Sequence, residues 1–266
     1  MKFCFRIFLA AYEYVVFYIA LAWFGLICLA WSLPATALYF LLPGRHGRRL
    51  GRAMIMGGFR LYVASLALSG RFRFDLSALD ALRDEKSLII AANHPSLWDA
   101  VLLVSRLPPD VACIMKADIL NNIFLGGGAR LAGYICNESS RRMIVEAIQD
   151  VQRGSHLLLF PEGTRTVRCP IGPLTGSVGV IAHRGKVPVQ TVFIETDSPF
   201  LGKGWPVYKK PPMPVIFRVR LGHRFDPPEN SMAFIGELER YFAGELGPKV
   251  PPSAAPAPVR ETATVD

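Results

Sequence analysis

Residues 14–44 contain no charged side chain, and this 31-residue run is the feature that most constrains the fold. A helix needs about 20 apolar residues to cross the core of a bilayer, so the run is long enough to enter a membrane. A secretory signal, the main alternative, has an apolar region of only about 7–15 residues, although Ala35-Thr36-Ala37 would offer it a cleavage site. The run therefore predicts a retained membrane anchor.

Two arrangements of this anchor fit the sequence. A single span would extend from Tyr14 to Leu33, whereas a break near Gly25 or Pro34 would produce a re-entrant helical hairpin. Four arginines follow at positions 45, 48, 49 and 52, and clustered arginines mark the cytoplasmic side of a membrane. The hairpin is favoured because it places Lys2 and Arg6 on that side too. Either arrangement predicts an inner-membrane protein whose remaining part lies in the cytoplasm.

From Gly70 onward the composition is that of an α/β domain. Short apolar runs alternate with helix-like segments, which favours a mixed, largely parallel sheet flanked by helices. The expected strands are 88–92, 111–115, 156–160, 187–194 and 215–221, and the expected helices are 97–106, 141–152, 175–184 and 231–246. The predicted organisation is an anchor at 1–44, a globular domain at 45–246 and a disordered Pro/Ala-rich tail at 247–266.

Three further segments have simpler interpretations. Residues 53–69 are apolar apart from Arg60 and predict a helix that lies either on the membrane or on the core. Gly126-Gly127-Gly128 is interpreted as a flexible turn, because a lone glycine run is poor evidence for phosphate binding. Residues 199–214 predict a surface loop with three solvated lysines, Lys203, Lys209 and Lys210.

The composition limits the classes of binding partner that are expected. The net charge of +9 fits an anionic membrane surface or a negatively charged substrate. Nucleic acid is not expected, because the arginines cluster beside apolar segments instead of forming a basic stripe with interleaved aromatic residues. The five cysteines are scattered without a C-x-x-C pair, which predicts reduced thiols and no zinc site. No metal ion is expected.

The stretch Asn93-His94-Pro95-Ser96-Leu97-Trp98-Asp99 follows an expected strand and precedes an expected helix. His94 therefore lies in a strand-to-helix turn, where a side chain can point into a cleft. Asp99, one turn inside the helix, would orient the imidazole and stabilise its charged form, as a general base requires. Ser96 and Asp99 also fit a capping box, in which Asp99 only satisfies backbone N–H groups.

A second polar stretch, Phe160-Pro161-Glu162-Gly163-Thr164-Arg165, follows the expected strand at 156–160. Polar turns at the ends of two buried strands can line one crevice, the usual place for ligands in an open α/β sheet. Arg165 can hold a phosphate in a bidentate fork.

Together the two stretches resemble the glycerolipid (lysophosphatidic acid) acyltransferase family, which pairs an N-H-x-x-x-x-D block with an F-P-E-G-T-R block. Val187-Pro188-Val189 matches a third family element, so the resemblance covers about residues 71–192. It implies transfer of a fatty acyl group from acyl-CoA or acyl carrier protein to a lysophospholipid hydroxyl, without a cofactor. His94 and Asp99 would be catalytic, and Glu162, Gly163, Thr164 and Arg165 would bind the substrate.

One family element differs in this chain. The family has an Asp-Arg pair a few residues after a glycine, whereas Gly133 is followed here by Asn137-Glu138, with no arginine before Arg141. Arg141 is therefore a candidate for restoring the missing charge. The favoured acceptor is 1-acylglycerol-3-phosphate, which would give phosphatidic acid, and the alternative is another lysolipid or an acceptor without phosphate. A thioesterase and a non-catalytic membrane-binding protein are less favoured.

Overall fold

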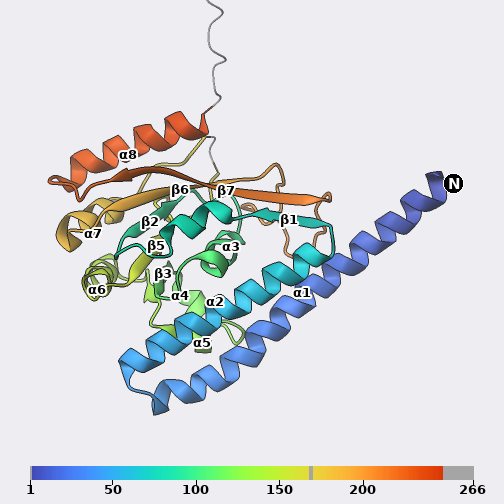
Figure 1. Cartoon of the computed structure of the whole chain (residues 1–266), viewed down its shortest axis with the longest axis horizontal. Coiled ribbons are helices and arrows are strands. Elements are labelled where there is room, and N and C mark those ends of the chain that lie inside the picture. The colour runs from blue at the N-terminus through green and yellow to red at the C-terminus, as the bar shows by residue number, and fades with distance from the viewer. Residues whose placement is uncertain (1, 168–169, 248–266) are drawn as a thin grey trace, which may run out of the picture.

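A seven-stranded sheet forms the centre of the computed structural model, which describes residues 2–167 and 170–247 (Figure 1). Its order is β1-β7-β6-β2-β5-β3-β4, and every neighbouring pair is parallel except β6 with β7. The strands are β1 (Phe72–Asp75), β2 (Ile89–Ala92), β3 (Val111–Met115), β4 (Ile135–Cys136), β5 (His156–Leu159), β6 (Val189–Glu195) and β7 (Val215–Phe225). The predicted mixed, largely parallel sheet is confirmed.

Helices cover both faces of this sheet. They are α1 (Lys2–Leu41), α2 (Gly44–Leu68), α3 (Asp99–Arg106), α4 (Ala117–Leu120), α5 (Gly126–Ala132), α6 (Ser140–Gln152), α7 (Ser177–Gly185) and α8 (Ser231–Leu246), with a 3₁₀ helix η1 (Ser77–Leu82). The core on one face includes α6, α7 and α8, and the core on the other includes α1, α2 and α3. The tail predicted at 247–266 lies outside the described residues, apart from Gly247.

Burial on both faces explains why the central strands are apolar throughout. In β2, Ile89 and Ala91 point into the core beside α6–α8, whereas Ile90 and Ala92 point into the core beside α2 and α3. A strand of a covered parallel sheet has no solvent-facing side, so it shows a continuous apolar run instead of alternation. The apolar run at 88–92 was therefore a sound strand signal.

α1 and α2 form an antiparallel hairpin along one side of the sheet domain, with the turn at Leu42 and Pro43 (Figure 1). The break predicted near Gly25 or Pro34 is therefore wrong, because α1 is continuous through both positions. Ser32 and Ala35, which lie on either side of Pro34, are buried. This packing holds the helix together where the proline removes one backbone N–H.

The glycine run at 126–128 is not a flexible turn, because it forms the first turn of α5 against α1. A Cβ atom on Gly127 would lie 2.2 Å from the Ser32 carbonyl oxygen, and the Gly127 N–H donates to Ser32 Oγ at 3.1 Å. Only glycine permits this close approach of two backbones. The prediction failed because it considered chain flexibility and not helix packing.

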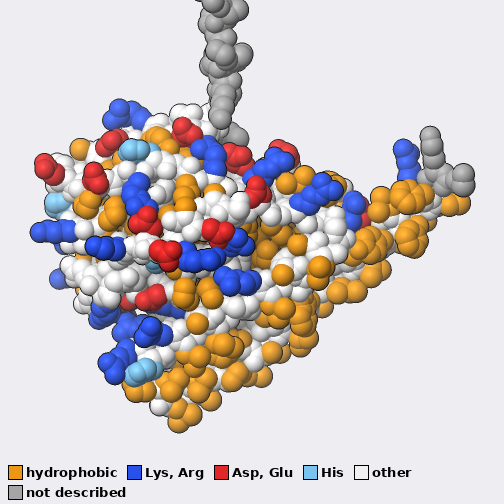
Figure 2. Space-filling model, in the orientation of Figure 1, with side chains coloured by type: hydrophobic (Ala, Val, Ile, Leu, Met, Phe, Trp, Pro, Cys, Tyr) orange, Lys and Arg blue, Asp and Glu red, His pale blue; other side chains and the backbone are white. Residues whose placement is uncertain are grey.

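The outward side of α1 carries exposed apolar side chains along most of its length, among them Phe8, Ile19, Leu26, Leu33 and Phe40. Figure 2 shows these hydrophobic groups as a band along the hairpin, continuing past the sheet domain at the N-terminal end. Within the described residues, α1 is the one helix that is long and apolar enough to cross a membrane, over Cys4–Leu41. Forty residues of helix extend about 60 Å, twice the thickness of a hydrocarbon core.

α2 packs on α3 and α5, so the predicted helix at 53–69 lies on the core and begins earlier, at Gly44. Arg52 is buried, unlike the other arginines expected to mark the cytoplasmic side. Its guanidinium forms ion pairs with Asp110 at 2.6 Å and Asp150 at 2.5 Å. It therefore fastens the hairpin to the sheet domain.

Candidate active site

His94 and Asp99 lie together directly after β2, as predicted. His94 Nδ1 is 2.8 Å from Asp99 Oδ2, and the Asp99 side chain has no solvent exposure. With Nδ1–H donating to this oxygen, Nε2 carries the lone pair that a general base needs. Burial raises the pKa of the Asp99 carboxyl above its usual value, and the hydrogen bond from His94 opposes that rise.

The contacts expected from the two alternative roles of Asp99 occur together. Its Oδ2 also accepts a hydrogen bond from the Ser96 N–H at 2.8 Å, while Ser96 Oγ accepts from the Trp98 N–H at 3.2 Å. α3 begins at Asp99, two residues later than predicted, so Asp99 is the first residue of the helix and not one turn inside it. One carboxylate oxygen thus fixes both the imidazole and the turn.

The second stretch lies beside the first because β5 pairs with β2. The Thr166 N–H donates to the His94 carbonyl oxygen at 2.7 Å, and the Phe160 ring stacks on the imidazole at 3.9 Å between centroids. Gly163 has a φ of 67°, which only glycine adopts without strain, and Thr164 is half-buried. Phe160 therefore supports His94 directly, a contact that the motif alone did not indicate.

The polar groups of the second stretch are partly engaged within the protein. Glu162 is buried and accepts from Thr166 Oγ1 at 2.5 Å and from the Gly172 N–H at 2.8 Å, so it braces its own loop. Arg165 Nη1 donates to the carbonyl oxygens of Leu201 at 2.8 Å and Gly202 at 2.9 Å. In this structure, one nitrogen of the predicted phosphate fork holds the segment after β6.

That segment, residues 196–214, contains neither helix nor strand, in line with the predicted loop. It is tied to the site, because the Leu97 N–H donates to the Leu201 carbonyl at 3.0 Å and Ser96 Oγ donates to the Phe200 carbonyl at 3.0 Å. The prediction that its lysines are all solvated is wrong for Lys210, which pairs with Glu13 of α1 at 3.1 Å.

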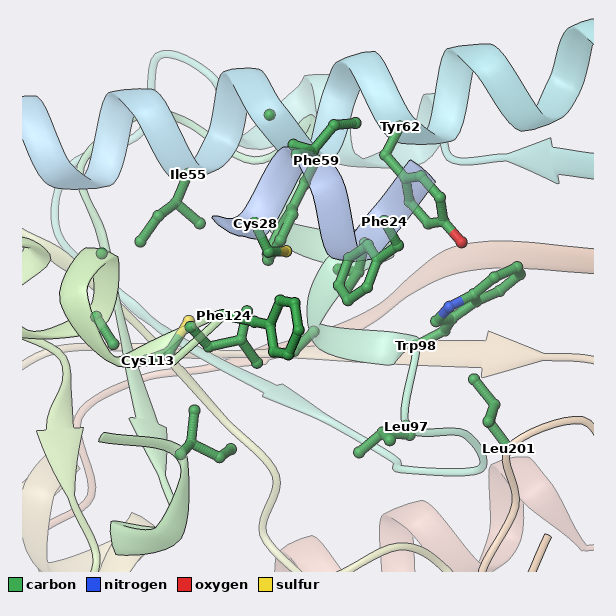
Figure 3. A pocket seen from close by; sticks show the side chains of 18 of the residues that line it. Phe24, Cys28, Ile55, Phe59, Tyr62, Leu97, Trp98, Cys113, Phe124 and Leu201 are labelled. Atoms are coloured by element: carbon green, nitrogen blue, oxygen red, sulfur yellow. The ribbon is translucent and has the colours of Figure 1, made fainter. Parts of the chain in front are cut away.

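A cavity of about 390 Å³ opens beside His94, within the size range of about 300–1,000 Å³ that is usual for ligand pockets. Its wall is mostly apolar and includes residues of α1, α2, β3, α5 and the turn that contains His94. Figure 3 shows Phe24, Cys28, Phe59 and Tyr62 of the hairpin facing Leu97, Trp98 and Leu201 across it. Sequence reasoning missed this cavity, because its lining comes from segments more than a hundred residues apart.

Arg141 is exposed in the first turn of α6. Its neighbour Arg142 pairs with Glu146 at 2.7 Å, with 80 % of the arginine side chain exposed. None of the hydrogen bonds or ion pairs within residues 2–167 and 170–247 connects either arginine with the turn that contains His94 and Asp99. No group of three or more His, Cys, Asp or Glu side chains in these residues could hold a metal ion.

Comparisons with known proteins cover the segment that contains both stretches. The family model described as Acyltransferase matches residues 73–195, which include both stretches. A 1-acyl-sn-glycerol-3-phosphate acyltransferase of Pseudomonas aeruginosa is 22 % identical over 179 residues, which cover 65 % of this chain and 69 % of that protein. The human 1-acyl-sn-glycerol-3-phosphate acyltransferase beta is 25 % identical over 197 residues, which cover 69 % of this chain and 66 % of that protein.

The fold also has a counterpart among solved structures. The crystal structure of the 1-acyl-sn-glycerophosphate acyltransferase PlsC of Thermotoga maritima matches with a TM-score of 0.61 and 17 % identity, over 88 % of this chain and 93 % of that one. The matched segments of the curated relatives cover between 47 % and 69 % of their own lengths. Residues 73–195 thus form an acyltransferase domain. The chain is similar to 1-acyl-sn-glycerol-3-phosphate acyltransferases, the resemblance that its two stretches predict.

Proposed function

We propose that this protein is a membrane-bound O-acyltransferase that moves a fatty acyl group from an acyl thioester to the hydroxyl of a lysophospholipid. The observation that carries the proposal is the His94–Asp99 pair, with His94 in the wall of an apolar cavity. The pair supplies a base for a hydroxyl, and the cavity supplies a place for an acyl chain. The donor, acyl-CoA or acyl carrier protein, is a substrate, and no cofactor is required.

The reaction balances with these groups. His94 Nε2 takes the proton of the acceptor hydroxyl while that oxygen attacks the thioester carbonyl, and the tetrahedral intermediate that forms carries a negative oxygen. When it collapses, the C–S bond breaks, and the imidazolium returns its proton to the thiolate that leaves. Asp99 keeps Nδ1 protonated and stabilises the imidazolium. The products are an ester and a free thiol.

The acceptor we propose first is 1-acylglycerol-3-phosphate, which appears in the names of the relatives. Its acylation would give phosphatidic acid. Among the described residues, Arg165 donates hydrogen bonds through Nη1 and none through Nε or Nη2. The Nε–Nη2 edge of the guanidinium can therefore bind a phosphate. Glu162, Gly163 and Thr164 shape the loop that presents this edge.

A second acceptor class is supported by Glu138, which is exposed and stands where the family has its Asp-Arg pair. Neither Arg141 nor Arg142 bonds to the turn that contains His94, so neither replaces the missing charge there. A carboxylate beside the acceptor site would repel a phosphate and attract an amine. A lysolipid with a cationic or neutral head group is therefore the alternative acceptor.

We further propose the arrangement of the chain at the membrane. The exposed apolar side of α1 would lie in the cytoplasmic leaflet of the inner membrane, with residues 1–44 as the anchor and residues 45–246 as the catalytic domain. The basic residues that follow α1 would contact anionic lipid head groups.

The test is an assay with a labelled acyl thioester and a panel of lysolipid acceptors, run on the full-length chain in vesicles. Transfer to 1-acylglycerol-3-phosphate is expected, and His94→Ala should lower it about 10²–10⁴-fold. His183→Ala, which alters an exposed histidine bonded to the Pro228 carbonyl, serves as the matched control. Label released equally without any lipid acceptor would instead indicate a thioesterase, and no turnover at all would indicate a binding protein.

A further inference from the structure

The Phe160 ring lies face to face with the imidazole of His94. The two ring centroids are 3.9 Å apart, and the ring planes differ by 14°. Aromatic rings in proteins prefer offset or edge-on contacts with centroids about 4.5–7 Å apart, so a nearly parallel stack at this distance is uncommon. It is the shortest centroid distance among the aromatic pairs of residues 2–167 and 170–247. A contact this close restricts what the imidazole can do.

The backbone around Phe160 is fixed on both sides of the residue. Phe160 directly follows β5, and its carbonyl oxygen accepts from the Gly163 N–H at 2.9 Å. The next residue, Pro161, has a locked φ. Its carbonyl oxygen accepts from the N–H of Thr175 at 2.7 Å and from the hydroxyl of the same residue at 3.0 Å. The Phe160 ring therefore meets the imidazole from a rigid support.

Asp99 by itself leaves one motion of the imidazole unrestrained. Its Oδ2 contacts His94 Nδ1 at 2.8 Å, and within residues 2–167 and 170–247 this is the one hydrogen bond that the imidazole makes. A single contact fixes one corner of the ring, but the ring can still tilt about the line between that corner and Cβ. Tilting moves Nε2 out of line with the hydroxyl whose proton it is to take. The Phe160 ring, packed flat against one face, opposes this tilt.

The stack also acts on the charge that develops during the reaction. The face of a benzene ring carries partial negative charge and attracts a cation within about 6 Å of its centroid. His94 becomes an imidazolium when it takes the acceptor proton, so the attraction is stronger in the transition state than before it. Both rings line the apolar cavity, and the His94 side chain is only 14 % exposed, so water screens the contact little.

We propose that Phe160 is a positioning residue of the reaction. It fixes the plane of the His94 imidazole so that Nε2 points at the acceptor hydroxyl, and it stabilises the imidazolium that forms. The inference rests on the proposed function, in which His94 is the general base. It separates the work of the first residue of the second stretch from that of Arg165, which binds the acceptor. An aliphatic side chain at position 160 would fill the space without a flat face and without its partial negative charge.

Steady-state kinetics of transfer by the full-length chain test this inference. Phe160→Leu keeps apolar bulk without the ring, Phe160→Met repeats the test with a more flexible side chain should the leucine variant not fold, and Phe160→Tyr keeps the ring. Phe24→Leu is the matched control, because Phe24 also lines the cavity but packs on Phe59 and Tyr62 instead (Figure 3).

The expected results differ between kcat and KM. Phe160→Leu and Phe160→Met should lower kcat about 5–30-fold, the effect of losing one shielded contact between a ring and a cation, and leave both KM values nearly unchanged. Phe160→Tyr should restore most of kcat, because its ring has the same flat face. Phe24→Leu should raise the donor KM and leave kcat unchanged, since it alters the cavity wall away from the imidazole.

Nuclear magnetic resonance of protein labelled at histidine reads the stack itself without any turnover. The ring protons of His94, identified with His94→Gln, lie over the face of Phe160, so its ring current should shift their resonances upfield. Phe160→Leu and Phe160→Met should abolish this shift, whereas Phe160→Tyr and Phe24→Leu should retain it.

The outcomes separate this inference from the proposed function. A lower kcat together with loss of the upfield shift supports the positioning role. Wild-type kcat in Phe160→Leu and Phe160→Met would overturn the role alone, as would an equal loss of kcat in Phe24→Leu or a loss of kcat with the shift retained. No transfer by the wild-type chain would overturn the proposed function and this role with it.

Discussion

Replacing Arg52 by methionine tests how the hairpin is held on the sheet domain. Arg52 lies in α2 and is 2 % exposed, and its Nε donates to the Ala132 carbonyl at 3.0 Å. Its Nη1 contacts Asp110 and Ser155, and its Nη2 contacts Asp150. Methionine fills a similar volume but leaves these acceptors without a donor.

The cost of this change follows from the burial of the two carboxylates. Asp110 is 50 % exposed and can turn to water, whereas Asp150 is 6 % exposed and keeps only Arg48 and Arg153, each at 3.8 Å. Breaking a buried pair on one side costs about 3–5 kcal/mol, and the loss here lies toward the lower end of that range because Arg48 and Arg153 still compensate part of the Asp150 charge. For a chain of this size, that corresponds to a decrease of roughly 6–20 °C in Tm.

Thermal unfolding of the full chain in detergent, followed by near-UV circular dichroism, measures this effect. Arg142→Met is the matched control, since it breaks an exposed pair that solvent screens and should leave the Tm nearly unchanged. The double variant Arg52→Met/Asp150→Leu should recover much of the loss, because it removes the stranded charge. A Tm for Arg52→Met that matches the control would refute the reasoning.

Three further predictions concern the site and the anchor. Asp99→Asn keeps an oxygen for the Ser96 N–H and should fold, but transfer should fall about 10²–10⁴-fold, and near-full activity would exclude the orienting role. Burial raises the pKa of Asp99 in the folded state, so the wild type should lose stability as the pH rises through that raised pKa. Thermal unfolding measured across the acidic range should show this loss for the wild type and not for Asp99→Asn. Arg165→Lys keeps a charge but loses the fork, so the acceptor KM should rise more than the donor KM, and equal increases would contradict phosphate binding. Mass analysis of the mature protein should find residues 14–44 intact, and a chain beginning at Leu38 would contradict the anchor.

The sheet and the contact between His94 and Asp99 were predictable for physical reasons. A strand covered on both faces must be apolar throughout, so β2, β3 and β5 appear in the sequence as unbroken apolar runs. His94 and Asp99 are five residues apart, and a short strand-to-helix turn brings such positions together without help from the rest of the fold. Features that depend only on neighbouring residues can be predicted without knowing the tertiary structure.

The rest of the site depends on contacts between distant segments. Arg52 was grouped with the exposed arginines, because nothing in its neighbourhood shows that Asp150 lies 98 residues away in the sequence and 2.5 Å away in space. The contact of Arg165 with the Leu201 carbonyl was also missed, because a backbone acceptor leaves no trace in sequence. The break was predicted near Gly25 or Pro34 and not at Pro43, since glycine and proline in a helix interior favour a break and here tertiary packing overrides them.

The continuous form of α1 changes what the anchor does. One side of the helix contributes Phe17, Phe24 and Cys28 to the cavity wall, while Leu26 and Leu33 on the outer side are 57 % and 66 % exposed. Because α1 is continuous, both sides belong to one helix. The apolar cavity is therefore only one helix away from the surface that we propose lies in the bilayer. Removing the anchor would take away a wall of the cavity as well, so truncated protein should lose affinity for fatty acids even in detergent, where no membrane is present to be bound.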